Sequence, residues 1–247
     1  MTPLLEVQGL RKSFGGIAAV DGVDLTVSHG EVRALIGPNG AGKTTLFNLL
    51  TGHLAPDAGA VRFRGERLDG LAPARIWRRG LARTFQIPAV FANLTVLENV
   101  QVPLASRARR TLSLRGRSTT IERAAATTLL ARVGLAGVAD RPAGVLAYGD
   151  LKKLEVAIAL ANDPALLLLD EPAAGMAPVE RRALMALVEG IARGEGVTLL
   201  FTEHDMDVVF TVADRITVLH QGRVIADGEP ARVRSDPEVQ RVYLGEL

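Results

Sequence analysis

A glycine-rich stretch ending in lysine and threonine carries the most specific chemistry in the sequence. It reads Gly37-Pro38-Asn39-Gly40-Ala41-Gly42-Lys43-Thr44 and is followed by Thr45. Glycines let such a loop wrap, so that its backbone N–H groups point at the β- and γ-phosphate oxygens of a nucleotide. Lys43 would add a mobile positive charge, and the Thr44 hydroxyl is placed to ligate Mg²⁺. The stretch predicts a binding site for ATP and Mg²⁺.

Two adjacent acids follow a purely apolar run later in the chain. Leu166–Leu169 leads directly into Asp170 and Glu171. Such a run is typical of a strand buried on both faces, and parallel sheets bind ligands at the carboxyl ends of their strands. Asp170 would reach Mg²⁺ directly or through water. Glu171, pointing to the opposite side as successive strand residues do, would polarise an attacking water.

Alternating apolar runs and turns provide the elements that must position these residues. The strand Val32–Ile36 enters the glycine-rich loop, and the apolar helix Leu46–Leu50 follows it. This alternation predicts an α/β fold with a parallel sheet and an antiparallel β portion. The other expected strands are Leu4–Gln8, Val23–Val27, Ala60–Arg64, Leu81–Phe85, Ala165–Leu169, Val197–Thr202, and a hairpin of Arg215–His220 with Arg223–Ala226.

Helical signals are concentrated in the middle of the chain. Thr95 and Glu98 have the spacing of a capping box. Further helices are expected at Ile121–Val133, Leu151–Ala161 and Pro178–Arg193, the last of them ended by Gly194. We therefore expect a helical subdomain over about residues 87–161, inserted into a core formed by about 1–86 and 162–247.

Composition limits the classes of function. Lys and Arg total 29 against 27 Asp and Glu, so bulk charge does not indicate a nucleic-acid partner. The absence of cysteine excludes disulfides and thiolate metal sites. The N-terminal residues lack the pattern of a signal peptide, and Ala165–Leu169 is far shorter than the roughly 20 residues of a membrane-spanning helix. Any action at a membrane is expected from its side, without a membrane-spanning segment.

Four further segments occur in a characteristic order around these motifs. They are Phe14, Gln86, the run Leu146-Ala147-Tyr148-Gly149-Asp150, and Glu203-His204-Asp205. Together with the glycine-rich loop and the acidic strand, the ordered set resembles ABC transporter ATP-binding subunits over essentially the whole chain. The resemblance implies a P-loop ABC-type ATPase domain with a mixed sheet core, an antiparallel β subdomain and an inserted helical subdomain.

The resemblance also implies roles for single residues. Phe14 would stack on adenine with Val20 as its apolar neighbour, although core packing is the alternative for an isolated phenylalanine. Gln86 would contact Mg²⁺ and the attacking water, although an isolated glutamine is more often a plain strand end. His204 would bind the γ-phosphate and hold the water of Glu171.

In such proteins the Leu146–Asp150 segment of one subunit completes the ATP site of a second. A helix N-terminus entered through glycine donates backbone N–H groups to phosphate. Ala147, Tyr148, Gly149 and Asp150 would therefore contact the nucleotide of a partner subunit, either an identical chain or a paralogue.

Several segments resemble one branch, the ATP-binding subunits of branched-chain amino acid uptake systems. Such importers combine two ATPase subunits with two membrane permeases and an external binding protein. We therefore expect an ATPase subunit that acts peripherally on the inner face of the cell membrane. The segments are Leu146–Asp150, Ile36–Thr45, Arg83–Gln86, Asp170–Gly175, Glu203–Met206 and Tyr243–Glu246.

Some positions depart from the usual pattern. Ala147 lacks a hydroxyl for phosphate, and the charge of Asp150 is unfavourable there unless the side chain turns away or caps the helix. Ala177 stands where most relatives have an aspartate that couples the two sites, and Ile158 replaces a commonly basic residue. The Arg107–Arg117 segment could touch lipid or a permease, or be a solvated loop.

Three other functions remain open at this point. One is an ATPase subunit for the export of lipid or lipopolysaccharide. Another is an ABC ATPase that acts on nucleic acid or ribosomes and not in transport, although the long coiled-coil insertions of that class are missing. The third is a regulatory module that binds ATP without hydrolysing it.

Overall fold

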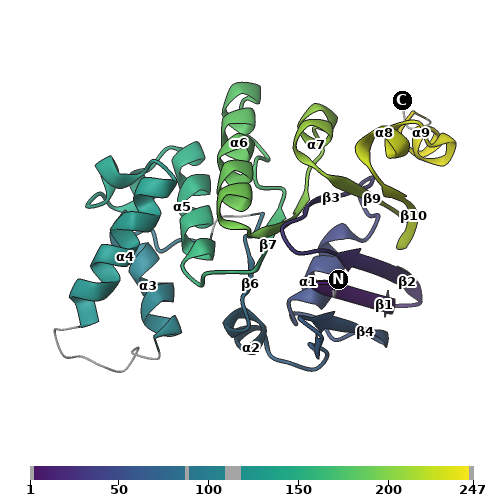
Figure 1. Cartoon of the computed structure of the whole chain (residues 1–247), viewed down its shortest axis with the longest axis horizontal. Helices are drawn as coiled ribbons and strands as arrows, with labels where there is room; N and C mark the ends of the chain where they lie inside the picture. Colours follow the sequence, from purple (N-terminus) through teal and green to yellow (C-terminus); the bar gives the residue numbers. More distant parts are fainter. Residues whose placement is uncertain (1–2, 87–88, 109–117, 245–247) are drawn as a thin grey trace.

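The computed structural model describes residues 3–86, 89–108 and 118–244, and its central feature is a mixed sheet (Figure 1). In this part of the chain six strands have the order β10-β9-β3-β8-β7-β6. Five of them run parallel, and β10 pairs antiparallel with β9. Their bounds are β3 Val32–Ile36, β6 Leu81–Arg83, β7 Leu166–Asp170, β8 Thr198–Thr202, β9 Arg215–His220 and β10 Arg223–Gly228.

A second, antiparallel sheet packs beside the first. Its order is β2-β1-β4-β5, with bounds β1 Leu5–Phe14, β2 Ile17–Val27, β4 Ala58–Phe63 and β5 Glu66–Arg67. One buried apolar cluster joins this sheet to helix α1 (Lys43–Leu50) and to one face of the central sheet, where Leu35, Leu168 and Leu200 contribute. The loop that precedes α1 is therefore supported from both sheets.

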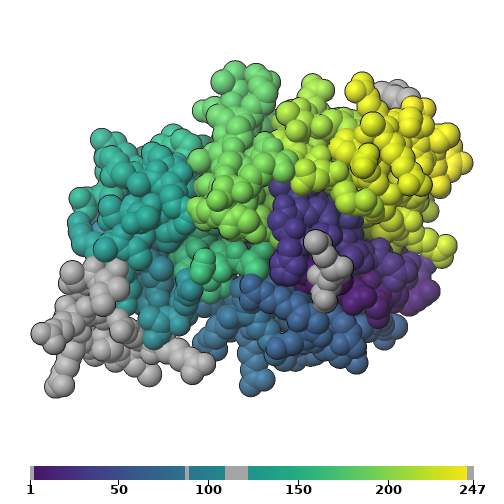
Figure 2. Space-filling view, viewed as in Figure 1, coloured from purple at the N-terminus to yellow at the C-terminus, as the bar shows by residue number. Residues whose placement is uncertain are grey.

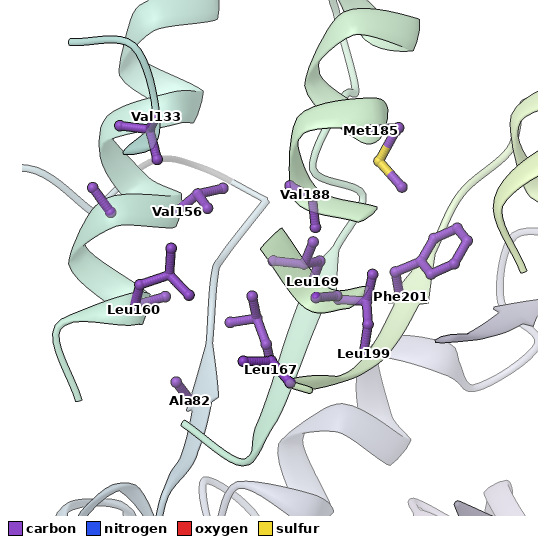
Figure 3. Close-up of a cluster of buried hydrophobic side chains, with 14 of the residues drawn as sticks. Ala82, Val133, Val156, Leu160, Leu167, Leu169, Met185, Val188, Leu199 and Phe201 are labelled. Atoms are coloured by element: carbon purple, nitrogen blue, oxygen red, sulfur yellow. The ribbon is translucent and has the colours of Figure 1, made fainter. Parts of the chain in front are cut away.

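The opposite face of the central sheet is covered by helices. A second apolar cluster packs Leu167, Leu199 and Phe201 of the sheet with Met185 and Val188 of α6 (Figure 3). Because β3, β7 and β8 are buried on both faces, most of their residues are apolar. The helices flanking the sheet are α2 Pro73–Arg78, α6 Pro178–Glu195, α7 Met206–Val212, α8 Pro230–Arg234 and α9 Pro237–Leu244.

Three helices form a group at one end of the molecule (Figures 1 and 2). They are α3 (Val96–Arg107), α4 (Ser118–Arg132) and α5 (Tyr148–Leu160), with the short 3-10 turns η1 (Ala136–Val138) and η2 (Ala143–Val145) between α4 and α5. Their apolar side chains belong to the same cluster that covers the sheet. The core therefore continues from the sheet into these helices, and α5 contacts both β6 and α6.

The expected α/β architecture with an antiparallel sheet and a helical group is confirmed, with several different boundaries. Thr95 and Glu98 do form a capping box at the start of α3. Helix α5 begins at Tyr148, three residues before the expected start, and the extended residue Ala147 is its N-cap. None of the helices within the described ranges combines the length and the apolar character needed to cross a lipid bilayer.

The expected end of α6 at Gly194 is wrong. The helix continues to Glu195, and Gly196 takes the left-handed conformation at its C-terminus with φ 68°. Both glycines suit a helix end by sequence alone. Gly196, and not Gly194, adopts the left-handed conformation, which residues with a Cβ disfavour.

We predict opposite effects from alanine at these two glycines. Gly194→Ala should raise the free energy of unfolding by about 0.5 kcal/mol, because alanine loses less conformational entropy within a helix. Gly196→Ala should lower it by about 1 kcal/mol, because alanine resists positive φ. A Cβ at either position would meet no described atom within 4 Å, so packing does not confound the comparison. Urea unfolding of both variants checks the prediction, and equal shifts would contradict it.

Candidate active site

The glycine-rich loop between β3 and α1 depends on close backbone contacts. A Cβ added at Gly37 would lie 2.1 Å from the carbonyl oxygen of Leu219, and one added at Gly42 would lie 2.2 Å from that of Ala19. Only glycine fits at such separations. The loop is therefore held tightly against β9 and β2, which gives its backbone N–H groups fixed directions.

Lys43 is the buried cation of this loop. Its Nζ donates to the carbonyl oxygen of Gly37 at 2.6 Å and to that of Pro38 at 3.1 Å. Burial lowers the pKa of Lys43 from its ordinary value, while the nearby charges of Glu171 and Asp170 act to raise it. A cavity of about 190 Å³ opens here, and its lining consists of Ala19, Asn39–Thr45 and Glu171.

Asp170 ends β7 and is only 4% exposed. Its Oδ2 accepts a hydrogen bond from Arg83 at 2.8 Å, and its Oδ1 accepts one from the Thr202 hydroxyl at 3.0 Å. The same Thr202 oxygen accepts the backbone N–H of Glu171 at 2.9 Å. Thr202 on β8 therefore ties the two acids of β7 together.

Glu171 lies outside the strand, which corrects the expected reason for its orientation. Strand alternation does not set its direction, because β7 ends at Asp170 and Glu171 has φ 48°. A left-handed conformation is uncommon for a residue other than glycine, and such strain clusters at functional sites. The turn directs the Glu171 carboxylate into the lining of the cavity.

The three expected catalytic side chains meet at this carboxylate. Gln86 Nε2 donates to Glu171 Oε2 at 3.0 Å, and His204 Nε2 lies 2.9 Å from Glu171 Oε1. They come from the segments that follow β6, β7 and β8, which are adjacent parallel strands. An amide, a carboxylate and an imidazole arranged in this way can orient one water molecule and accept its proton.

The donor set fits Mg²⁺. Thr44 offers a hydroxyl, Asp170 a carboxylate and Gln86 an amide oxygen, all of them the hard ligands that Mg²⁺ prefers. Across the described residues, no group of three or more His, Cys, Asp or Glu side chains could hold a metal by itself. Mg²⁺ commonly uses one or two protein ligands together with substrate phosphates, which matches this sparse arrangement.

The two residues expected at the adenine differ in exposure: Phe14 is exposed and Val20 is buried. Phe14, at the end of β1, is 47% exposed with the Lys12 ammonium 5.7 Å from its ring centre. This exposure argues against the alternative of core packing. Val20 is 1% exposed and belongs to the core beneath, so it presents almost no surface to a nucleotide.

The N-terminus of α5 packs on the loop that follows Glu171. A Cβ added at Gly175 would lie 3.6 Å from the Tyr148 ring, and one added at Gly149 would lie 3.5 Å from the Met176 methyl. Asp150 pairs with Lys153 of the same helix at 2.9 Å. Neither Ala147 nor any residue of this first turn is among the described residues that line the cavity at Lys43.

The remaining departures occupy structural positions. Ala177 is the N-cap of α6, where its methyl group accepts no hydrogen bond. Ile158 packs against the core cluster. Most of the Arg107–Arg117 segment lies outside the described residues, as do the last two positions of the Tyr243–Glu246 segment.

Sequence reasoning missed Arg83, whose guanidinium side chain is 5% exposed. It lies 5.5 Å from the ring centre of Phe47 and 5.1 Å from that of Phe85, and it donates to Asn48 as well as Asp170. Arg83 thus ties α1 to the acid at the end of β7. An arginine at the end of an otherwise apolar strand, three residues before Gln86, is the signal that could have identified it.

Comparison with known proteins agrees with this geometry. The family model for ABC transporter matches residues 20–174, and that for branched-chain amino acid ATP-binding cassette transporter matches residues 223–246. The high-affinity branched-chain amino acid transport ATP-binding protein LivG of Escherichia coli K12 is 44% identical over 253 residues, covering 99% of this chain and 98% of that protein.

Solved structures show the same fold. The ADP conformation of an ATP-binding cassette of an ABC transporter has a TM-score of 0.87 and 34% identity, covering 99% of this chain and all of that one. A dimeric cassette in a post-hydrolysis state bound to ADP and Pi has a TM-score of 0.79 and 25% identity, covering 92% and 98%. The matched family spans more than half of the sequence and the relatives span nearly all of it, so the chain belongs to the ABC transporter family as one of its ATP-binding ATPase subunits.

Proposed function

We propose that this ABC ATPase energises an importer of branched-chain or related amino acids, by closing two ATPase subunits around ATP and reopening them after hydrolysis. The observation that carries the hydrolysis part of the proposal is the meeting of Gln86 and His204 on the two carboxylate oxygens of Glu171, beside the loop of Lys43. A regulatory module without hydrolysis would not need this cluster.

The residues divide the chemistry among them. Glu171 is the base that takes a proton from the attacking water, and Gln86 and His204 fix the direction of its two oxygens. Lys43 and the loop N–H groups hold the β- and γ-phosphates. Transfer of the γ-phosphoryl group to water depends almost entirely on such positioning and on stabilisation of its charge. When bound to Thr44, Asp170 and Gln86, Mg²⁺ would neutralise charge that develops on the phosphate oxygens.

A second copy or a paralogue is required to complete the site. The first turn of α5 lies on the loop after Glu171 and does not contribute to the described lining of its own chain's cavity. The backbone N–H groups at the start of a helix suit a phosphate, here one brought by another subunit. The dimeric cassette bound to ADP and Pi, to which this fold is similar, supports that arrangement.

The transport role rests on the relatives. LivG is described as a branched-chain amino acid transport ATP-binding protein, and the branched-chain family model matches the C-terminal segment that contains α8 and α9. We infer that the subunit docks from the inner face of the cell membrane on two permease subunits, which receive the amino acid from an external binding protein.

Glu171→Gln should separate nucleotide binding from turnover. The amide keeps the shape of the side chain and removes the base, so kcat for ATP should fall by about 10²- to 10⁴-fold while ATP affinity stays near parental. Phosphate release and equilibrium binding measure the two quantities. Because ATP is then retained, size-exclusion chromatography with ATP should show a stable dimer. Glu180→Gln, on the exposed first turn of α6, is the control. Phosphate release at the parental rate would refute Glu171 as the base.

Uptake experiments test the transported substrate. In cells that lack the gene for this chain, uptake of labelled leucine should be lost and should return with the parental gene. Lys43→Ala should fail to restore it, because the phosphates lose their buried cation. The Glu180→Gln variant should restore it fully. Normal leucine uptake in the deleted cells, together with a defect in lipid or lipopolysaccharide export, would replace the import proposal.

A further inference from the structure

Two oppositely charged side chains of α5 are buried outside the catalytic cluster. Lys152 and Glu155 lie one turn apart, with side chains 1% and 6% exposed and 3.5 Å between Nζ and Oε2. Burial raises the pKa of Glu155, against the bond from Phe85 and the charge of Lys152. A buried ion pair is weak evidence for stability, because desolvation can exceed the attraction between the charges. Its retention here requires another explanation.

Both ions bind the backbone that leads into the catalytic glutamine. Glu155 Oε1 accepts the N–H of Phe85 at 2.6 Å. Lys152 Nζ donates to the carbonyl oxygen of Gln86 at 2.9 Å. Pairing of this segment with the sheet continues through Thr84, whose N–H donates to Leu168. After Thr84, Glu155 and Lys152 bind the backbone of Phe85 and Gln86 in place of the neighbouring strand.

The same pair contacts the first turn of its own helix. The Lys152 ammonium lies 5.8 Å from the ring centre of Tyr148, within the range of a cation–π contact. Tyr148 belongs to the turn that we assign to the nucleotide of the partner subunit. Gln86, whose carbonyl oxygen accepts from Lys152, donates through its side chain to Glu171. The buried pair therefore stands between the two halves of the catalytic apparatus.

We propose that Lys152 and Glu155 are positioning residues that clamp the Phe85–Gln86 backbone to α5, so that Gln86 and the helix N-terminus at Tyr148 move as one body against Glu171. The inference rests on the proposed role of Gln86 in hydrolysis. It adds that the position of Gln86 is fixed from α5 as well as from its own strand β6.

The double variant Lys152→Met/Glu155→Met separates positioning from stability. Each single methionine variant leaves one charge buried without its partner and should lower the Tm. The double variant removes both charges and keeps the apolar volume, so its Tm should recover towards the parental value. Its kcat for ATP should nevertheless stay about 10-fold below parental, with KM within about 2-fold, because Gln86 is no longer held. Glu155→Gln keeps an acceptor for Phe85 and should retain most of the kcat.

Amide hydrogen exchange of Phe85 provides a readout that is independent of activity. Exchange should speed up in the double variant, which lacks the Glu155 acceptor, and stay slow in Glu155→Gln. Arg132→Met is the matched control, because Arg132 pairs with Glu195 and ties α4 to α6 without contact to the clamp. This control should leave kcat and Phe85 exchange at parental values.

Two results would overturn the clamp. One is a double variant whose kcat recovers together with its Tm, which would show a purely structural role. The other is unchanged exchange of Phe85. Gln86→Ala, measured in parallel, distinguishes failure of the proposed function. A parental rate in Gln86→Ala would refute the role of Gln86 itself. A slow Gln86→Ala beside a fast double variant would refute only the clamp.

Discussion

Adjacent parallel strands end at the same edge of a sheet, and this constraint determines where the candidate catalytic groups lie. Strand β3 delivers the glycine-rich loop, β6 leads to Gln86, β7 to Asp170 and Glu171, and β8 to His204. The register pairs Asp170 directly with Thr202, so the acids and the histidine segment leave the sheet at one level. Gln86 and His204, more than a hundred positions apart in sequence, therefore both reach Glu171.

Burying charge at this edge requires compensation, and the fold supplies it in pairs. Asp170 has Arg83 and Thr202, and Lys43 has the loop carbonyls and the charges of both acids. Buried charges without partners would shift their pKa values and neutralise. Paired in this way, the acids and the lysine stay in fixed positions before a nucleotide arrives. Preorganised charge of this kind is the main source of catalysis in phosphoryl transfer.

The sequence predicts those chemical groups whose motifs consist of residues close together in the chain. The loop from Gly37 to Thr44 and the acids after Leu169 could be placed because each motif is local and follows a mainly apolar strand. The left-handed turn of Glu171 could not be predicted, since no local pattern marks a glutamate for positive φ. Arg83 and the Lys152–Glu155 pair were missed for a different reason. Their partners lie tens of residues away, so only tertiary structure identifies them.

Small residues line the contact between the α5 N-terminus and the loop after Glu171 within one chain. Tyr148 lies against Gly175, and Gly149 lies near the Met176 methyl, so α5 contacts this loop through backbone and apolar surface. Ala177, at the start of α6, contributes no carboxylate to this contact. The loop after Glu171 is therefore expected to move as a unit, because packed surfaces have discrete arrangements and deform little between them. In the proposed movement of Gln86 and the α5 N-terminus against Glu171, the contacts of Tyr148 with Gly175 and of Gly149 with Met176 are the ones that must rearrange.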